Sequence, residues 1–279
     1  LLAITPYVSG LYDNISGDSD FDAGADIFWK PNGQFQLSAT INPDFGQVES
    51  DDLVVNFDAN ETFFSDKRPF FTENQGPFEF TTPSDFSQLV YTRRVGGPAD
   101  DGSGPGDITA AVKANGSFGA TKYGVLMADE ADPAGRTFSA LRVSHDFAKQ
   151  SVGMMYTTVD RPYFDRTANV LGFDQNWRPN ERLSIQNRLI FSDIDEGAAD
   201  SPSVGQTEKG DGFTTIIDYE MDKGWRQQWL GMHFSDSLQI NDFGFLSRNN
   251  LNYAHWQVMK RITGMGAESK YSSHDWRAR

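Results

Sequence analysis

A cluster of aromatic and charged residues around position 70 has the residue types that bind ions. Phenylalanine pairs lie on both sides of a charged stretch that contains Arg68. A guanidinium binds a carboxylate through two parallel hydrogen bonds, so we predict that Arg68 pairs in this way with Glu61, Glu73 or Asp51. The candidate residues are Asp51, Glu61, Phe63, Phe64, Asp66, Lys67, Arg68, Phe70, Phe71, Glu73, Arg93 and Arg94.

Two interpretations of this cluster are open. In the first, the rings and ion pairs lock an irregular segment against the inner wall of a barrel. In the second, arginines and carboxylates face each other across a lumen and form a gate or a ligand contact. Arg93 and Arg94 belong to a predicted strand, residues 89–95, and would point to opposite sides. One of them must then face a lumen or an interface, because an arginine at the lipid midplane costs about 2–4 kcal/mol.

Other chemistry has little support, and we predict no catalytic residues and no enzyme. The four histidines lie far apart in the sequence, cysteine is absent, and neither a Gly-x-Ser-x-Gly nor a His-Glu-x-x-His motif occurs. A membrane-embedded hydrolase would need a Ser or Asp/His cluster at one barrel end. Acidic stretches could collect Ca²⁺, but none has the spacing of a calcium loop, so no cofactor or metal site is predicted and a solvated outward face is the simpler interpretation. These stretches are residues 13–22, 100–107, 129–132 and 193–196.

Composition excludes two broad classes. The net charge of −15 over 279 residues argues against a nucleic-acid partner, which needs clustered Lys and Arg. No window approaches the roughly 18 apolar residues of a membrane-spanning helix. A membrane β-barrel escapes that test, because its strands alternate lipid-facing apolar with lumen-facing polar side chains. The 22 Phe, 9 Tyr and 6 Trp suit aromatic girdles.

Period-two alternation supports strands. Phe21, Ala23, Ala25 and Ile27 share one face, and residues 35–41 repeat the pattern after a Pro-Asn-Gly turn, which predicts a hairpin. Further strands are predicted at 108–114, 119–128, 138–147, 151–160, 169–177, 183–193, 213–220 and 225–235. Short connections at 148–150, 178–181 and 221–224 alternate with long ones at 130–136, 161–167 and 194–212, as in outer-membrane barrels. A soluble antiparallel sandwich or propeller is the competing interpretation.

Four blocks carry a family resemblance: residues 42–51, 61–73, 90–96 and 240–250. In this order they resemble an uncharacterised family of bacterial outer-membrane barrels, a domain of unknown function that follows a family 9 carbohydrate-binding-like domain. Only the barrel part is present. Ser65-Asp66 stands where Pro-Glu is expected. The resemblance implies the outer membrane of a Gram-negative bacterium but no established activity.

We therefore predict an all-β fold: an antiparallel up-and-down transmembrane β-barrel, partial, spanning residues 1–279. Residues 45–86 form an irregular lumen-facing insertion, a plug or constriction. The predicted function is a channel or uptake component with a plugged lumen; the alternative is a non-conducting membrane anchor or scaffold for a binding domain or a larger outer-membrane complex. Expected partners are outer-membrane lipid, lipopolysaccharide and other outer-membrane or periplasmic proteins. From its two ends we interpret the chain as a mature or truncated piece.

Overall fold

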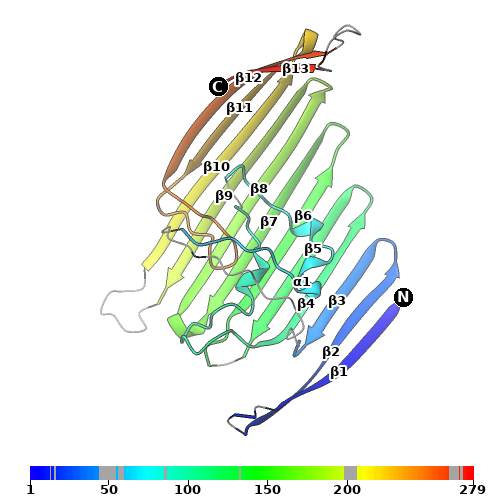
Figure 1. Ribbon diagram of the computed structural model, residues 1–279, viewed down its shortest axis with the longest axis vertical. Helices are drawn as coiled ribbons and strands as arrows, with labels where there is room; N and C mark the ends of the chain where they lie inside the picture. Colours follow the sequence, from blue (N-terminus) through cyan, green and yellow to red (C-terminus); the bar gives the residue numbers. More distant parts are fainter. Residues whose placement is uncertain are drawn as a thin grey trace.

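The chain forms one antiparallel sheet in which each strand pairs with the next (Figure 1). The computed structural model describes residues 1–12, 14–15, 17–43, 55, 60–84, 87–131, 133–197, 206–263, 270 and 273–279. The thirteen strands are β1 (Leu2–Tyr12), β2 (Ser19–Asn32), β3 (Phe35–Ile41), β4 (Ile108–Phe118), β5 (Thr121–Glu130), β6 (Thr137–Asp146), β7 (Gln150–Arg161), β8 (Arg166–Asn180), β9 (Leu183–Glu196), β10 (Gln206–Glu220), β11 (Trp225–Phe234), β12 (Leu251–Thr263) and β13 (Ser273–Ala278). The predicted up-and-down antiparallel fold is confirmed.

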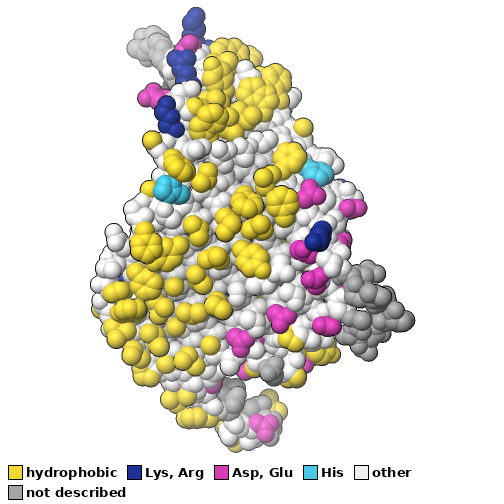
Figure 2. Space-filling model, turned by 180° about the vertical axis from the view of Figure 1, so that it is seen from behind, with side chains coloured by type: hydrophobic (Ala, Val, Ile, Leu, Met, Phe, Trp, Pro, Cys, Tyr) yellow, Lys and Arg dark blue, Asp and Glu magenta, His cyan; other side chains and the backbone are white. Residues whose placement is uncertain are grey.

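The two faces of the sheet differ in the way a membrane-barrel wall requires. The outer face exposes large apolar side chains, including Trp29, Met127, Leu141, Tyr156, Phe173, Trp177, Leu189, Phe191, Phe213, Trp225, Trp229 and Trp256. Figure 2 shows hydrophobic side chains spread over this face. Polar outer residues bond one another: Asn187 donates to Gln175 and accepts from Thr215. Such pairing is what lipid demands of polar groups.

Strand register confirms the predicted hairpin of residues 21–41. Ile27 lies opposite Ala39, and Asp26 lies opposite Thr40, so the apolar and polar sets share faces across the pair as the alternation predicted. The register also settles β11, where neither face is purely apolar in the sequence. Trp229 lies opposite Trp256 on the outer face, which leaves Arg226 on the inner face.

The sheet is open within the described residues, because β1 and β13 are not paired with each other. No helix among those residues is both long and apolar enough to cross a membrane. The helices are short: α1 (Pro69–Thr72) and the 3-10 turns η1 (Gly76–Phe78), η2 (Thr92–Arg94), η3 (Pro162–Phe164) and η4 (Asp222–Gly224).

Two connections predicted to be long are shorter. β7 continues to Arg161 and β8 begins at Arg166, so only η3 and Asp165, in the left-handed region at φ 49°, separate them. β9 runs to Glu196 and β10 begins at Gln206. Apolar alternation stops where a strand leaves the lipid, but the ladder continues on backbone hydrogen bonds and polar pairs such as Thr207 with Asp195.

Two irregular segments lie on the inner face (Figure 1). We name the described residues 60–84 and 87–107 the first inward segment and residues 235–250 the second inward segment. They connect β3 to β4 and β11 to β12, and the strand register places both connections at the same end of the sheet. The predicted insertion covers residues 45–86, of which the structure describes residue 55 and residues 60–84; the irregular backbone continues to Asp107.

The predicted strand at 89–95 is wrong. Arg94 and Val95 donate their amides to the carbonyls of Tyr91 and Thr92, which makes a 3-10 turn, and the neighbouring Gln88 forms isolated bridges with Thr81 and Phe245. The apolar residues here face a core between the segment and the wall, where no neighbouring strand is available. Phe71, Phe78, Phe80 and Leu89 pack with the buried inner-face residues Ile108, Leu126, Phe138, Met155 and Ile190.

A glycine on the wall permits this close packing. A Cβ on Gly172 of β8 would lie 2.5 Å from Leu89 Cδ1 and 2.8 Å from Phe80 Cε2. Any larger residue would push the first inward segment away from the wall and open a cavity in the core.

We expect Leu189→Arg, on the outer face of β9, to lower the free energy of unfolding by about 2–4 kcal/mol in lipid, because the charge would face hydrocarbon. Urea unfolding in lipid vesicles measures this. Gln186→Arg, on the inner face of the same strand, is the matched control and should cost far less. Equal losses in both variants would contradict the assignment of the faces.

Candidate functional site

Arg68 forms a two-point ion pair with Asp66. Its Nε lies 2.9 Å from Asp66 Oδ1 and its Nη2 2.7 Å from Oδ2. Arg68 also donates to the carbonyls of Thr92 (2.8 Å) and Val95 (2.7 Å) and so clamps the start of α1 to η2. The predicted two-point pairing is present, but its partner is Asp66 rather than Glu61 or Glu73, because a local turn brings residues i and i+2 together. Asp51 lies outside the described residues.

The Asp66 carboxylate is nearly buried and remains ionised. Burial by itself would raise the pKa of Asp66, but hydrogen bonds from Arg68 and Thr92 and the Arg68 charge hold this pKa below its usual value. The Thr92 hydroxyl donates to Asp66 Oδ2 at 2.7 Å. The carboxylate thus has a fixed set of donors within the first inward segment.

Arg93 and Arg94 both act within the inward segments, and neither lies on a strand. Arg94 donates through Nη1 and Nη2 to the Glu61 carboxylate at 2.8 and 2.7 Å, and through Nε to the Gly244 carbonyl at 3.2 Å. It therefore joins the first segment to the second. The Arg93 guanidinium lies 5.8 Å from the centre of the Phe64 ring. A 3-10 turn, unlike a strand, lets neighbouring arginines face the same protein interior.

The candidate aromatics are packing residues. Phe63 stacks on Tyr91 at 5.0 Å between ring centres and meets Phe245 edge-on at 5.2 Å. Phe70 and Phe71 meet edge-on at 5.0 Å, and Arg68 lies 4.3 Å above the Phe71 ring. Phe64 is held through its backbone, since its carbonyl accepts from the Tyr91 hydroxyl at 2.8 Å.

The two remaining candidates have different surroundings. Lys67 is half-buried and the Glu73 side chain is exposed. The carbonyls of Glu73 and Phe70 accept hydrogen bonds from Lys113 Nζ, which reaches them from the inner face of β4. The sequence pattern did not single out Lys113, although its position between inward-facing Ala111 and Asn115 marks it as an inner-face charge.

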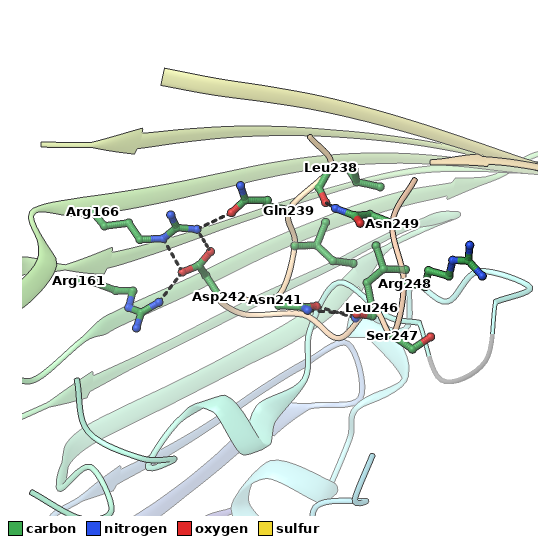
Figure 3. A pocket seen from close by; sticks show the side chains of 11 residues that line it. Arg161, Arg166, Leu238, Gln239, Asn241, Asp242, Leu246, Ser247, Arg248 and Asn249 are labelled. Atoms are coloured by element: carbon green, nitrogen blue, oxygen red, sulfur yellow. Dashed lines mark hydrogen bonds and ion pairs between the residues drawn. The ribbon is translucent and has the colours of Figure 1, made fainter. Parts of the chain in front are cut away.

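An alternating chain of seven charged residues joins both segments to the wall. The chain runs Glu130, Arg136, Asp100, Arg161, Asp242, Arg166, Glu196. Arg161 donates to Asp100 at 2.8 Å and to Asp242 at 2.9 Å, and Arg166 donates to Asp242 at 2.8 Å. Asp100 belongs to the first inward segment and Asp242 to the second. Figure 3 shows Arg161 and Arg166 converging on Asp242.

These carboxylates are well shielded from solvent. The side chains of Glu130, Asp100 and Asp242 are 1%, 2% and 7% exposed. Burial tends to raise the pKa of Asp242, but the hydrogen bonds and charges of Arg166 and Arg161 keep it below the usual value. Removing one member of a buried pair is costly, since its partner keeps a desolvated charge.

Sequence reasoning placed several of these residues wrongly. Asp100 and Glu130 fall in stretches interpreted as solvated outward loops, but both are buried and bind arginines of this chain; Glu196 also binds an arginine but is exposed, as expected. The alternation of faces along β5 could have identified Glu130 as an inward-facing residue, because Glu130 shares its face with Leu126 and Ala128. The Asn241–Gly244 block, part of a stretch that carries the family resemblance, lies within the second inward segment, where the Asn241 side chain bonds the backbone of Leu246.

A polar cavity of about 340 Å³ lies beside this network. Arg161 and Arg166 line it from the wall, and the second inward segment supplies Gln239, Asn241 and Asn249 (Figure 3). It could hold water or a small polar solute. Over the described ranges, no three carboxylate or histidine groups are arranged to hold a metal ion.

Comparison with known proteins yields one family and a set of distant structures. The family described as "Domain of unknown function (DUF5916)" matches residues 1–118. No curated protein is detectably similar. An OmpT loop-deletion mutant, an outer membrane protein of Vibrio cholerae, is 10% identical with a TM-score of 0.35 over 84% of this chain and 92% of that chain. A porin is 9% identical, with a TM-score of 0.40 over 96% of this chain and 91% of that chain. OccK8 (OprE) of Pseudomonas aeruginosa is 8% identical, with a TM-score of 0.40 over 93% of this chain and 69% of that chain.

We expect Asp242→Asn to release the second inward segment, because Arg161 and Arg166 would lose their shared carboxylate. The free energy of opening of this segment should fall by about 1–3 kcal/mol. Amide hydrogen exchange at Leu238 to Leu246 measures it. Asp222→Asn removes an exposed pair with Arg182 and should change exchange little, since such pairs contribute about 0–1 kcal/mol.

Acid should loosen the first inward segment only below the ordinary carboxylate range. Because the folded-state pKa of Asp66 lies below 3.8, its stabilising effect is complete above that pH and is lost as the pH falls through the lowered pKa. Exchange of segment amides from pH 5 to pH 2 tests this. In Asp66→Asn this acid-dependent step should be smaller than in the wild type; an unchanged profile would contradict the assignment.

Proposed function

We propose that this protein is a channel or uptake component of the outer membrane of a Gram-negative bacterium, with the two inward segments occupying its lumen. The apolar outer face supports contact with outer-membrane lipid and lipopolysaccharide. The inner face is polar beyond the segments, where Gln36, Asn115, Ser151, Asn176 and Gln186 share it. A polar inner face below an occluding segment fits a wet lumen.

The way the first inward segment is attached carries this proposal. Among the described residues, its main-chain hydrogen bond to the strands and their loops lies at its end, where Ala131 donates to the Asp107 carbonyl at 2.8 Å; ahead of the segment, Asn42 donates to the Thr109 carbonyl at 2.8 Å. Elsewhere, side chains such as Lys113 and the ion-pair chain hold it. The segment could therefore move without breaking the strand ladder.

We also propose that the role is not enzymatic. His145 forms a hydrogen bond with the Thr121 hydroxyl, and His233 forms one with the Asn252 side chain. Both histidines lie on the outer face. His255 contacts Tyr253 on the inner face of β12. These contacts occur on separate strands, and within the described residues no carboxylate is bonded to His145 to complete a triad with Thr121.

The alternative is a non-conducting anchor or scaffold for other outer-membrane or periplasmic proteins. The burial of Glu130, Asp100 and Asp242 favours it, because buried, fully paired charges hold both segments rigidly. The two proposals differ in whether the segments ever leave the lumen.

Single-channel conductance in planar bilayers tests the proposal. Asn42, which follows β3, bonds Thr109 of β4, so residues 44–106 between them can be replaced by a short Gly-Ser linker without straining the sheet. We expect small or brief currents from the complete protein and large steady currents from the deletion variant, because the core of the segment would no longer cover the wall.

The control is a second variant with the linker in place of residues 264–270, between β12 and β13, which should conduct like the wild type. Retention of strand content is checked by circular dichroism. If the deletion variant is folded and silent, the scaffold proposal replaces the channel proposal.

A further inference from the structure

Three charged residues lie in a row on the inner face of neighbouring strands. Arg142 belongs to β6, Asp174 to β8 and Arg188 to β9, and Asp174 lies directly opposite Arg188 in the register. Arg142 also lies 5.9 Å from the centre of the Phe80 ring, so the row borders the first inward segment. The row is separate from the seven-residue ion-pair chain.

The acid in this row is bound by the more distant arginine. Arg142 Nη1 donates a short hydrogen bond to Asp174 Oδ2 across the intervening β7. Gly153 of β7 makes this possible, because a Cβ there would lie 2.5 Å from Arg142 Nη2 and 2.6 Å from Asp174 Oδ2. The side chains of Arg142 and Asp174 are 10% and 11% exposed, so the pair is well enclosed.

Arg188 is left without a bound carboxylate of its own. It feels the charges of Asp174 and Arg142, but no hydrogen bond or ion pair of its guanidinium occurs among the residues that the structure describes. The side chain is half-buried. The row holds two arginines and one aspartate, so it has one positive charge in excess, and a half-buried guanidinium of this kind favours a bound anion.

A second polar group beside Arg188 is also unsatisfied. Thr214 of β10 lies directly opposite Arg188 and its hydroxyl is buried without a hydrogen-bond partner in the described part of the chain. Directly opposed residues on neighbouring strands are about 4.5–5.5 Å apart at Cβ. One oxygen between them could accept from both groups.

We propose that Arg188, with the Thr214 hydroxyl and the Arg142 charge beside it, forms an anion-binding position on the inner wall for carboxylate or phosphate oxygens. Arg142 is held by Asp174 and adds positive potential, while Arg188 supplies the free donors. This inference rests on the proposed channel function and names its solute class as anionic. A fixed arginine on a polar lumen wall selects for anions by charge.

Calorimetric titration of the complete protein in detergent with inorganic phosphate tests the binding. We expect Arg188→Gln to weaken phosphate binding at least about tenfold, the equivalent of one charge-assisted hydrogen bond. Arg188→Lys should recover part of it. Arg182→Gln removes an arginine from an exposed turn pair and should bind like the wild type.

Absent phosphate binding in the wild type, or unchanged binding in Arg188→Gln, would overturn the inference. A parallel measurement separates it from the channel function: the reversal potential of the deletion variant under a KCl gradient should favour chloride and shift toward potassium with Arg188→Gln. Arg188-dependent phosphate binding in a protein that never conducts would keep the anion site and reject the channel. Currents with a selectivity independent of Arg188 would keep the channel and reject the site's role in selectivity.

Discussion

The alternating ion pairs on the inner wall hold the interior of this protein together. Arg161 and Arg166 extend from the wall and share Asp242 of the second inward segment, and Arg161 also binds Asp100 of the first. Each charge in this arrangement has a partner of opposite sign, which offsets the cost of desolvation. Loss of the Asp242 carboxylate would leave Arg161 paired with Asp100 and Arg166 paired with Glu196, but it would remove both ion pairs between the second inward segment and the wall. The packing of both inward segments against the wall therefore depends on a few residues.

The second constraint is that the two faces of one sheet meet different surroundings. Outward side chains meet lipid and inward ones meet water, protein or the inward segments, so polarity alternates with each residue. Where polar residues face outward, as at Gln175 and Asn187, they bond each other. Where charges face inward, as at Lys113, they bond backbone carbonyls of the first segment. The alternation of polarity from one residue to the next thus serves both faces of the sheet.

The attachment of the segments decides how this protein could act. Side-chain contacts can exchange for water or solute one at a time, whereas a strand added to the sheet could leave only by breaking a whole ladder. The first segment is held mainly by side-chain contacts, with a main-chain hydrogen bond to the wall at Asp107. The row of Arg142, Asp174 and Arg188 lies at its margin, where a solute would meet the wall as the segment moved. Asp174 is bound to Arg142, so within the described residues its carboxylate forms no hydrogen bond with Arg188.

The sequence by itself determined the strands from β2 to β11 and most of their faces, because alternation is a local property set by the solvent on each side of the strand; β1, β12 and β13 were not predicted, and the register settled the faces of β11. It also indicated an irregular inward segment, since alternation fails there, and an arginine paired through two hydrogen bonds. Only the tertiary structure decided the partners. Glu61 binds Arg94, thirty-three residues away, and Asp242 binds arginines of β7 and β8. Ion pairs depend on distances in space between residues far apart in sequence, and no local pattern encodes which of many carboxylates a given arginine will meet. The same reason explains why residues 89–95 form a turn: their apolar side chains face a wall, and neighbours in space decided their backbone.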